Sequence, residues 1–257
     1  MTSRTSSLTA TNLSMRFGGV DVFSDISFAV RTGHVTGCIG PNGAGKSTLV
    51  NVICGVYCPV GGQVFLDERL LTGASTVEIV RRGVSRSFQD VRIFPTLTAL
   101  ENVQAAMPTR HGEEVYSFLF GYQASERTNR AVAMGLLDEL SLADVAGRTA
   151  QDLPFGQQKL IALARTIATG AQFLLLDEPA AGVELDLIPR ITALVQRLAQ
   201  QEQRGILLIE HNVDVIRAVA EDAFVLQGGR VIAHGGCQQV LNDERVIKEY
   251  LGRIYDA

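Results

Sequence analysis

The sequence has little of what marks several large classes of protein. Among its 257 residues there are four cysteines and no tryptophan, and the formal net charge is −4. Lys and Arg occur singly or in pairs, so no basic stripe forms, and we do not expect nucleic acid as a partner. The cysteines fit neither a zinc spacing nor a disulfide framework, and we expect small buried thiols. They are Cys38, Cys54, Cys58 and Cys237.

A long apolar run is also missing. Residues 47–66 come nearest because they carry no charge, but they include Asn51, Pro59 and a glycine pair. A membrane span needs ~20 predominantly apolar residues, so this segment does not qualify. The N-terminal segment holds no continuous apolar stretch of signal-peptide length. We therefore expect a chain that does not cross a bilayer and that stays in the cytosol.

What is present is the composition of a globular protein. Hydrophobic residues make up 46% of the chain, which is enough for a sizeable core. Domains hold roughly 100–200 residues, so the length fits one large domain or two modest ones.

The first third of the chain is dominated by short β-strand patterns. Strands are predicted at residues 8–17, 26–30, 35–39, 64–66 and 84–88. A glycine-rich turn after residue 39 leads into a helix that runs from about Lys46 to near Gly55. Ser75 and Glu78 form a capping-box pattern, which opens a second short helix ending near Arg82.

The middle of the chain, residues 89–153, carries helical patterns instead, and we interpret it as a helical subdomain. Thr98 and Glu101 form a second capping-box pattern, and residues 131–140 have apolar side chains at helical spacing. Residues 107–124 combine Pro and Gly with an aromatic cluster, which indicates a surface loop or a short helix that faces a partner.

The final third alternates helix and strand, which is the pattern of a parallel sheet. Helices are predicted at residues 156–169, 188–198 and 213–220, and strands at 173–176, 206–209, 223–226 and 231–234. The run at 173–176 is continuously apolar, as expected for a strand that is covered on both faces. A polar helical tail ends the sequence.

Residues 40–47 match the pattern G-x-x-x-x-G-K-[ST] without a mismatch, between a predicted strand and a predicted helix. In this context backbone amides surround phosphate oxygens, Lys46 reaches the β- and γ-phosphates, and Ser47 can ligate Mg²⁺. The alternative is a glycine-rich turn that binds nothing. The predicted nucleotide-binding set is Gly40, Pro41, Asn42, Gly43, Ala44, Gly45, Lys46, Ser47 and Thr48.

Two carboxylates follow the apolar strand at 173–176. Ligands bind at the carboxyl ends of strands in open α/β sheets, so Asp177 and Glu178 are expected at a site. Beside a phosphate-binding loop, Asp177 would hold Mg²⁺ and Glu178 would polarise an attacking water. An ordinary acidic pair at a strand end is the alternative.

With Gln89, residues 153–158 and His211 added in that order, the chain resembles the ATP-binding subunits of ABC transporters along essentially its full length. The resemblance implies a P-loop NTPase core of α/β class with an N-terminal antiparallel β subdomain and an inserted helical subdomain. The whole chain, 1–257, would be a single ABC ATPase domain. Residues 1–88 and 156–257 would form the nucleotide-binding core, and 89–155 the helical subdomain.

The family's signature, Leu-Ser-Gly-Gly-Gln, is altered in this sequence. Pro154 replaces the serine and Phe155 the first glycine, so the hydroxyl contact with the γ-phosphate of the opposing subunit's nucleotide is lost. Gly156 and Gln157 remain, at the start of a helix whose N-terminus points amides outward.

An aromatic residue before Gly-Gln-Gln resembles the uptake subfamily for branched-chain amino acids, which also includes urea and amide importers. Three further stretches share that resemblance. They are residues 86–89 followed by 91–94, residues 178–182, and residues 246–252.

The resemblance also assigns the remaining site residues. Phe17 takes the place of the aromatic residue that stacks on adenine, with a core-strand phenylalanine as the alternative. Gln89 would touch Mg²⁺ or the attacking water and report to the membrane subunit, and residues 180–183 match the loop that crosses the dimer interface. His211 fits the switch histidine that contacts the γ-phosphate.

These roles imply an ATPase that works as part of an importer. ATP and Mg²⁺ would bind between two nucleotide subunits, with Glu178 as the base and with Lys46, Gln89 and His211 assisting hydrolysis. The implied partners are transmembrane permease subunits, a second ATP-binding subunit and, indirectly, an extracytoplasmic solute-binding protein. The chain would be peripheral, at the cytoplasmic face of the inner membrane.

Four alternatives stay open. The chain could be a soluble ABC-type ATPase that acts on DNA or ribosomes, or the ATP-binding subunit of another ABC transporter. A P-loop kinase would use the same phosphate loop but would have no use for the signature helix. A binding module without catalysis is the fourth, and the complete set of Lys46, Asp177, Glu178 and His211 argues against it.

Overall fold

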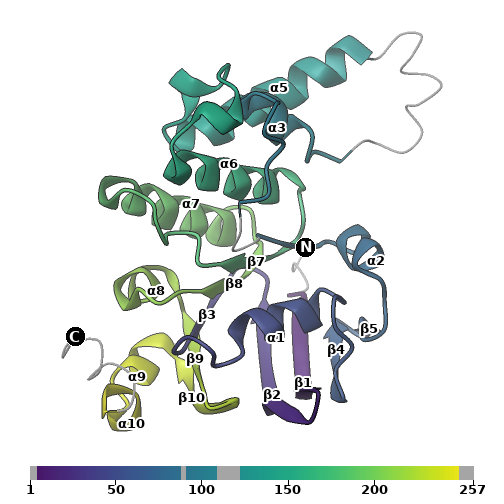
Figure 1. The fold of residues 1–257 in the computed structure, drawn as a ribbon, viewed down its shortest axis with the longest axis vertical. Helices are drawn as coiled ribbons and strands as arrows, with labels where there is room; N and C mark the ends of the chain where they lie inside the picture. The colour runs from purple at the N-terminus through teal and green to yellow at the C-terminus, as the bar shows by residue number, and fades with distance from the viewer. Residues whose placement is uncertain (1–4, 88–90, 109–121, 249–257) are drawn as a thin grey trace. The chain divides into compact units, whose positions relative to one another are not determined.

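The structure is a computed structural model that describes residues 5–87, 91–108 and 122–248 (Figure 1). The chain divides into two compact units. The sheet unit consists of Met1–Arg86, Gln172–Glu178 and Val195–Ala257, and the helical unit consists of Ser87–Ala171 and Pro179–Leu194.

The sheet unit begins with an antiparallel sheet of order β2-β1-β4-β5. Its strands are β1 (Ser7–Phe17), β2 (Val20–Arg31), β4 (Gly61–Leu66) and β5 (Arg69–Leu70). Gly18 and Gly19 have φ values of 51° and 88°. Two residues with positive φ form the tight turn that joins β1 to β2, which pair from Phe17 and Val20 onward.

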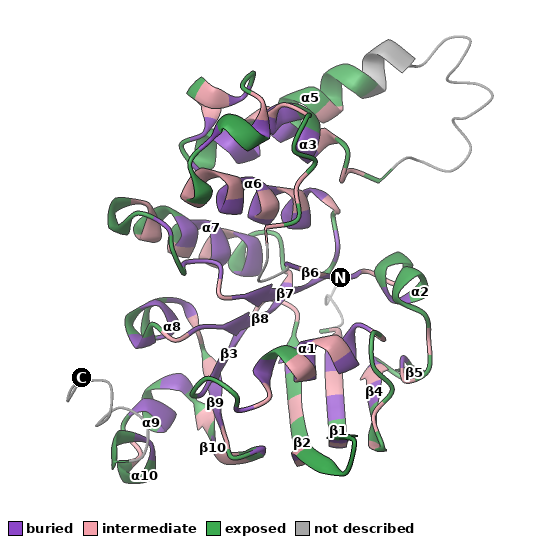
Figure 2. Ribbon diagram, viewed as in Figure 1, coloured by how far each residue is buried: buried purple, intermediate pink, exposed green. Residues whose placement is uncertain are grey.

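The second sheet has six strands in the order β10-β9-β3-β8-β7-β6. They are β3 (Val35–Ile39), β6 (Val84–Arg86), β7 (Phe173–Asp177), β8 (Gly205–Ile209), β9 (Asp222–Gln227) and β10 (Arg230–Gly236). All neighbours pair in parallel except β9 and β10. Every residue of β3, β7 and β8 is buried (Figure 2), which explains the continuous apolar runs at residues 173–176 and 206–209.

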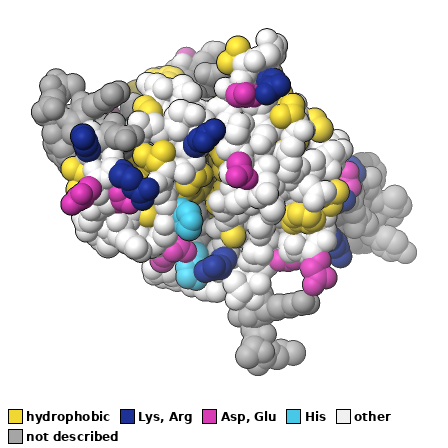
Figure 3. Space-filling model, turned by 90° about the horizontal axis from the view of Figure 1, so that it is seen from below, with side chains coloured by type: hydrophobic (Ala, Val, Ile, Leu, Met, Phe, Trp, Pro, Cys, Tyr) yellow, Lys and Arg dark blue, Asp and Glu magenta, His cyan; other side chains and the backbone are white. Residues whose placement is uncertain are grey.

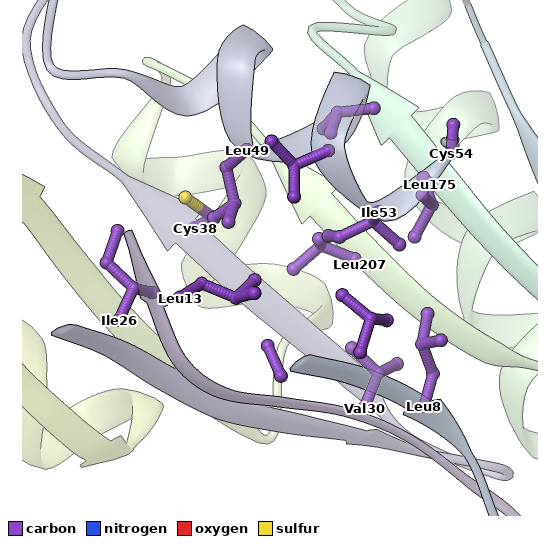
Figure 4. Close-up of a cluster of buried hydrophobic side chains, with 14 of the residues drawn as sticks. Leu8, Leu13, Ile26, Val30, Cys38, Leu49, Ile53, Cys54, Leu175 and Leu207 are labelled. Atoms are coloured by element: carbon purple, nitrogen blue, oxygen red, sulfur yellow. The ribbon is translucent and has the colours of Figure 1, made fainter. Parts of the chain in front are cut away.

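Helix α1 (Lys46–Ile53) shares one core with both sheets. In Figure 4, Leu49 and Ile53 of α1 lie among Leu13 of the antiparallel sheet and Leu175 and Leu207 of the parallel sheet. Leu49 is fully buried. Truncating such a side chain to alanine costs about 2–5 kcal/mol, so this core holds the start of α1 firmly.

The other helices of the sheet unit are short. They are α2 (Thr76–Arg81), α8 (Val213–Val219), α9 (Cys237–Leu241) and α10 (Glu244–Val246). Helix α7 (Ile188–Gln200) has residues in both units.

The helical unit is built on α3 (Ala99–Gln104), α5 (Tyr122–Glu139) and α6 (Phe155–Ala168). Two 3₁₀ turns, Ala143–Val145 and Ala150–Asp152, lie between α5 and α6, and a third, Leu185–Leu187, leads into α7. The buried Asn102 side chain accepts from the Phe94 amide at 2.8 Å and donates to the Phe94 carbonyl at 2.9 Å. It thereby fixes the segment before α3.

Most predicted elements are confirmed, including the α/β class and the parallel sheet. Both Thr98 and Glu101 make the bonds of a full capping box, whereas at α2 only the Ser75 half is present. The strand expected at 26–30 is longer and starts at Val20, because its outer half pairs with the end of β1. Residues 109–121 of the predicted partner-facing segment, and residues 88–90, lie outside the described residues.

The prediction that all cysteines are buried is wrong for Cys58. Three thiols are buried as expected, but Cys58 is exposed because it lies in the loop that follows α1. Burial raises the pKa of Cys38 and of Cys54 to about 12, which makes both thiols unreactive.

In the described part of the chain, no helix combines the length and the apolar character that crossing a membrane requires. On the face drawn in Figure 3, Lys and Arg side chains alternate with Asp and Glu rather than gathering in one area.

Candidate active site

The glycine-rich loop lies between β3 and α1, and its backbone geometry depends on glycine at three positions. A Cβ atom at Gly40 would lie 2.1 Å from the Leu226 carbonyl oxygen, so no side chain fits there. Gly43 and Gly45 have φ values of 78° and 103°, which favour glycine. No side chain caps the N-terminus of α1. The first amides of the helix are therefore available to an anion.

Lys46 is the first residue of α1 and is buried. Its Nζ donates to the Gly40 carbonyl at 2.7 Å and to the Pro41 carbonyl at 3.0 Å. Burial lowers the pKa of Lys46, while electrostatic interactions with Cys38, Glu178 and Asp177 raise it in part. The ammonium group thus lies folded over its own loop, close to two carboxylates.

Asp177 ends β7 and is almost fully buried. Burial raises its pKa above the usual range, and the charge of Glu178 adds to that rise. Arg86, Lys46 and a hydrogen bond with the Ser47 side chain act in the opposite direction. The hydroxyl of Ser47 and the carboxylate of Asp177 are therefore neighbours, although 130 positions separate them in the sequence.

Glu178 and His211 are in contact at the carboxyl ends of adjacent parallel strands. The Glu178 Oε1 atom lies 2.5 Å from His211 Nε2. Glu178 has a φ of 51°, a left-handed conformation that costs a non-glycine residue about 1 kcal/mol or more, and its amide donates to the Ile209 carbonyl at 2.9 Å. This arrangement turns the Glu178 side chain toward the end of β8.

Phe17 is 43% exposed, so the alternative of a core-strand phenylalanine is wrong. It ends β1 and pairs with Val20. Further along β2, Val22 and Phe23 lie against Gly45, whose Cβ position is 3.3 Å from Phe23 Cδ1. One short stretch of β2 thus runs from the tip of the hairpin to the phosphate-binding loop.

The altered signature opens α6 in the helical unit. Pro154 occupies the N-cap position, and no side chain caps this helix. Phe155 is 60% exposed. A Cβ atom at Gly156 would lie 3.3 Å from the Gly182 carbonyl oxygen, and Gln157 keeps a buried Oε1 without a hydrogen bond. The helix start and the loop at 180–183 are therefore in contact.

Lys159 strengthens that contact. Its buried Nζ donates to the Ala181 carbonyl at 2.6 Å. Sequence reasoning missed this bond, and no motif signals it.

Arg86 was also missed. Its guanidinium donates to the Asn51 Oδ1 atom at 2.5 Å and lowers the pKa of Asp177. The predicted Gln89 lies outside the described residues. The structure therefore brings Lys46, Ser47, Asp177, Glu178 and His211 together within the sheet unit.

Comparison with known proteins places this arrangement in a family. A family model described as ABC transporter matches residues 23–181. The chain belongs to the ABC transporter family. As an ABC ATPase it binds ATP and hydrolyses it to ADP and phosphate.

Curated relatives match this ABC ATPase over nearly its whole length. The branched-chain amino acid transport ATP-binding protein BraF of Pseudomonas aeruginosa is 36% identical, over 95% of this chain and 97% of the relative. LivG of Escherichia coli, of the same description, is 34% identical over the same shares. The lipopolysaccharide export ATP-binding protein LptB of Escherichia coli is 31% identical, over 96% of this chain and 98% of the relative.

Solved structures agree with the fold. A nucleotide-free ATP-binding cassette from an ABC transporter has a TM-score of 0.80 and 30% identity, and covers 95% of this chain and 98% of its own. A cassette in its ADP conformation has a TM-score of 0.79 and 29% identity, over 96% and 99% of the two chains. The expected P-loop core with an antiparallel β subdomain and a helical subdomain is confirmed.

Proposed function

We propose that this ABC ATPase drives an importer of branched-chain amino acids or related small amides. The observation that carries the proposal is the similarity to BraF and LivG, at 34–36% identity over 95% of the chain. The aromatic residue before Gly-Gln-Gln, Phe155, supports the same subfamily.

The phosphate chain of ATP would lie in the loop at residues 40–48. The uncapped start of α1 offers amides and a positive dipole end to the phosphates. Lys46 would exchange its bonds to Gly40 and Pro41 for bonds to the β- and γ-phosphates. The exposed ring of Phe17 would stack on adenine.

Ser47 and Asp177 fit a Mg²⁺ site, because they place a hydroxyl and a carboxylate oxygen side by side. Such oxygens are the ligands that Mg²⁺ prefers, and Gln89 would be the last of the ligands that the protein supplies. When bound, Mg²⁺ neutralises charge that develops on the β- and γ-phosphates.

Hydrolysis would proceed by attack of water on the γ-phosphorus. The bond between the γ-phosphorus and the oxygen that bridges it to the β-phosphate would break, and ADP and inorganic phosphate would be released. The Glu178 carboxylate would accept the proton of that water. His211 Nε2, which faces the carboxylate at 2.5 Å, would orient Glu178 and contact the γ-phosphate. Lys46 would stabilise the charge that builds up on the transferred group.

The ATP site would be completed by a second ATP-binding subunit, which is either a distinct chain or a second copy. Gly156 and Gln157 at the uncapped start of α6 would face the partner's nucleotide. Closure would be passed to transmembrane permease subunits through Gln89 and the helical subdomain. A solute-binding protein would deliver the substrate, and the chain would work at the cytoplasmic face of the inner membrane.

The similarity to LptB supports a second candidate, the ATP-binding subunit of a different ABC transporter. Deleting the gene in its host and measuring uptake of radiolabelled leucine and urea separates the two. Leucine or urea uptake should fall and should return with the wild-type gene but not with Glu178→Gln. Unchanged uptake of both solutes would contradict the importer proposal and favour the second candidate.

A further inference from the structure

The loop that follows α1 places an aromatic ring against Phe17. The ring centroids of Phe17 and Tyr57 are 5.1 Å apart, and the ring planes meet at 80°. A perpendicular ring covers at most one face of its neighbour. Phe17 is 43% exposed, so a face of its ring stays available to a planar ligand.

Tyr57 is itself tied to the helix of the phosphate-binding loop. The amides of Val56 and Tyr57 both donate to the Asn51 carbonyl, at 2.9 and 3.4 Å. Asn51 belongs to α1, and its side chain is held by Arg86 at 2.5 Å. On the far side of Tyr57, the Val60 amide donates to the Ser14 carbonyl of β1 at 2.9 Å. The Tyr57 ring thus stands on a loop that is fixed at both ends.

The spacing along the hairpin matches a nucleotide. Val22 and Phe23 lie against Gly45, and Val20 pairs with Phe17. Strand residues advance by about 3.3 Å, so Phe17 lies roughly 7–10 Å along the hairpin from the phosphate-binding loop. That separation suits a ligand whose base and phosphates are joined by a sugar.

We propose that Tyr57 is a positioning residue that holds the Phe17 ring in the orientation that stacks on adenine. This inference rests on the proposed role of Phe17 in binding the base. Tyr57 would act through Phe17 alone, and it would link the base platform to the helix that binds the phosphates.

The test measures binding of ADP and of inorganic pyrophosphate to the full chain by titration calorimetry. Tyr57→Ala should weaken ADP about 2–10-fold, the value of an aromatic pair, and leave pyrophosphate unchanged. Tyr57→Phe should keep wild-type affinity, and Tyr57→Leu should repeat the loss if the alanine variant fails to fold. Val60→Ala, an exposed change in the same loop, is the matched control and should alter neither ligand.

A double variant distinguishes the role of Tyr57 from the base-binding role of Phe17 on which it rests. Phe17→Ala should weaken ADP, and adding Tyr57→Ala should weaken it no further, because Tyr57 acts through Phe17. Three results would each overturn the role of Tyr57 and leave that of Phe17 standing. They are unchanged ADP binding in Tyr57→Ala, losses of ADP affinity that add up in the double variant, and an equal loss of pyrophosphate affinity in Tyr57→Ala. Unchanged ADP binding in Phe17→Ala would instead overturn the base-binding role of Phe17.

Discussion

Each unit of the molecule contains a buried lysine that donates to loop carbonyls. Lys46 of the sheet unit bonds to Gly40 and Pro41, and Lys159 of the helical unit bonds to Ala181. The bonds are alike, but the surroundings differ. Lys46 has Asp177 and Glu178 close by and an uncapped helix start beside it, whereas Lys159 follows an uncapped start that Pro154 leaves without a hydroxyl. A similar bond thus lies beside two carboxylates in the sheet unit and holds a loop in the helical unit.

The carboxylates beside Lys46 give the largest expected effect. Glu178→Gln should lower ATP turnover by about 10²–10⁴-fold, because the amide cannot accept the proton of water. ATP binding should persist, and the ATP-bound dimer should accumulate on a sizing column. Glu184→Gln, a nearby exposed glutamate, is the matched control and should keep normal turnover. Normal turnover in Glu178→Gln would remove Glu178 from the role of base.

Lys46→Met should separate chemistry from stability. We expect turnover to fall by about 10²–10³-fold, as when one transition-state donor is lost. The melting temperature should change little, because burial already disfavours the ammonium and lowers its pKa. Calorimetric scanning of the apo chain checks this. A large loss of stability would mean that Lys46 chiefly supports its own loop.

Lys159→Met should give the opposite result. Loss of a hydrogen bond from a charged group costs about 1.5–3 kcal/mol, or roughly 3–12 °C in melting temperature. ADP binding to the isolated chain should be retained, because Phe17 and the loop at 40–48, which would contact ADP, lie in the sheet unit. If Lys159→Met kept full stability but lost ADP binding, the proposed difference between the roles of Lys46 and Lys159 would be wrong.

Pro154→Ser should give the smallest effect. A serine oxygen can accept from the first amides of α6, which no side chain caps now, and should add about 1 kcal/mol. Thermal unfolding should show a rise of about 2–4 °C that Pro154→Ala does not reproduce. The combined change with Phe155→Ser should also speed turnover, and unchanged turnover would show that the altered signature does not limit this ATPase.

Most of the features that could be predicted from the sequence depend on local residue patterns. The phosphate-binding loop and the Thr98 cap depend on residues a few positions apart, so a single sequence reveals them. The contact of Ser47 with Asp177 followed from the rule that parallel strands end at one edge.

Other features depend on residues distant in the chain. Arg86 donates a hydrogen bond to Asn51, and Lys159 donates one to Ala181. These contacts depend on tertiary packing, which produces no periodic pattern in the sequence. The exposure of Cys58 could not be predicted for the same reason. The loop after α1 has an apolar composition, so its sequence alone does not distinguish it from a buried segment.

The fit of Gly40 against the Leu226 carbonyl has a consequence for synthesis on the ribosome. The loop at 40–48 emerges early, but the strands beside β3 are β8 and β9, which are translated more than 160 residues later. Strand β3 therefore has no partner in the parallel sheet while most of the chain is made, and pairing at such separation is slow. A nascent chain should gain nucleotide affinity abruptly, once residue 227 has left the exit tunnel.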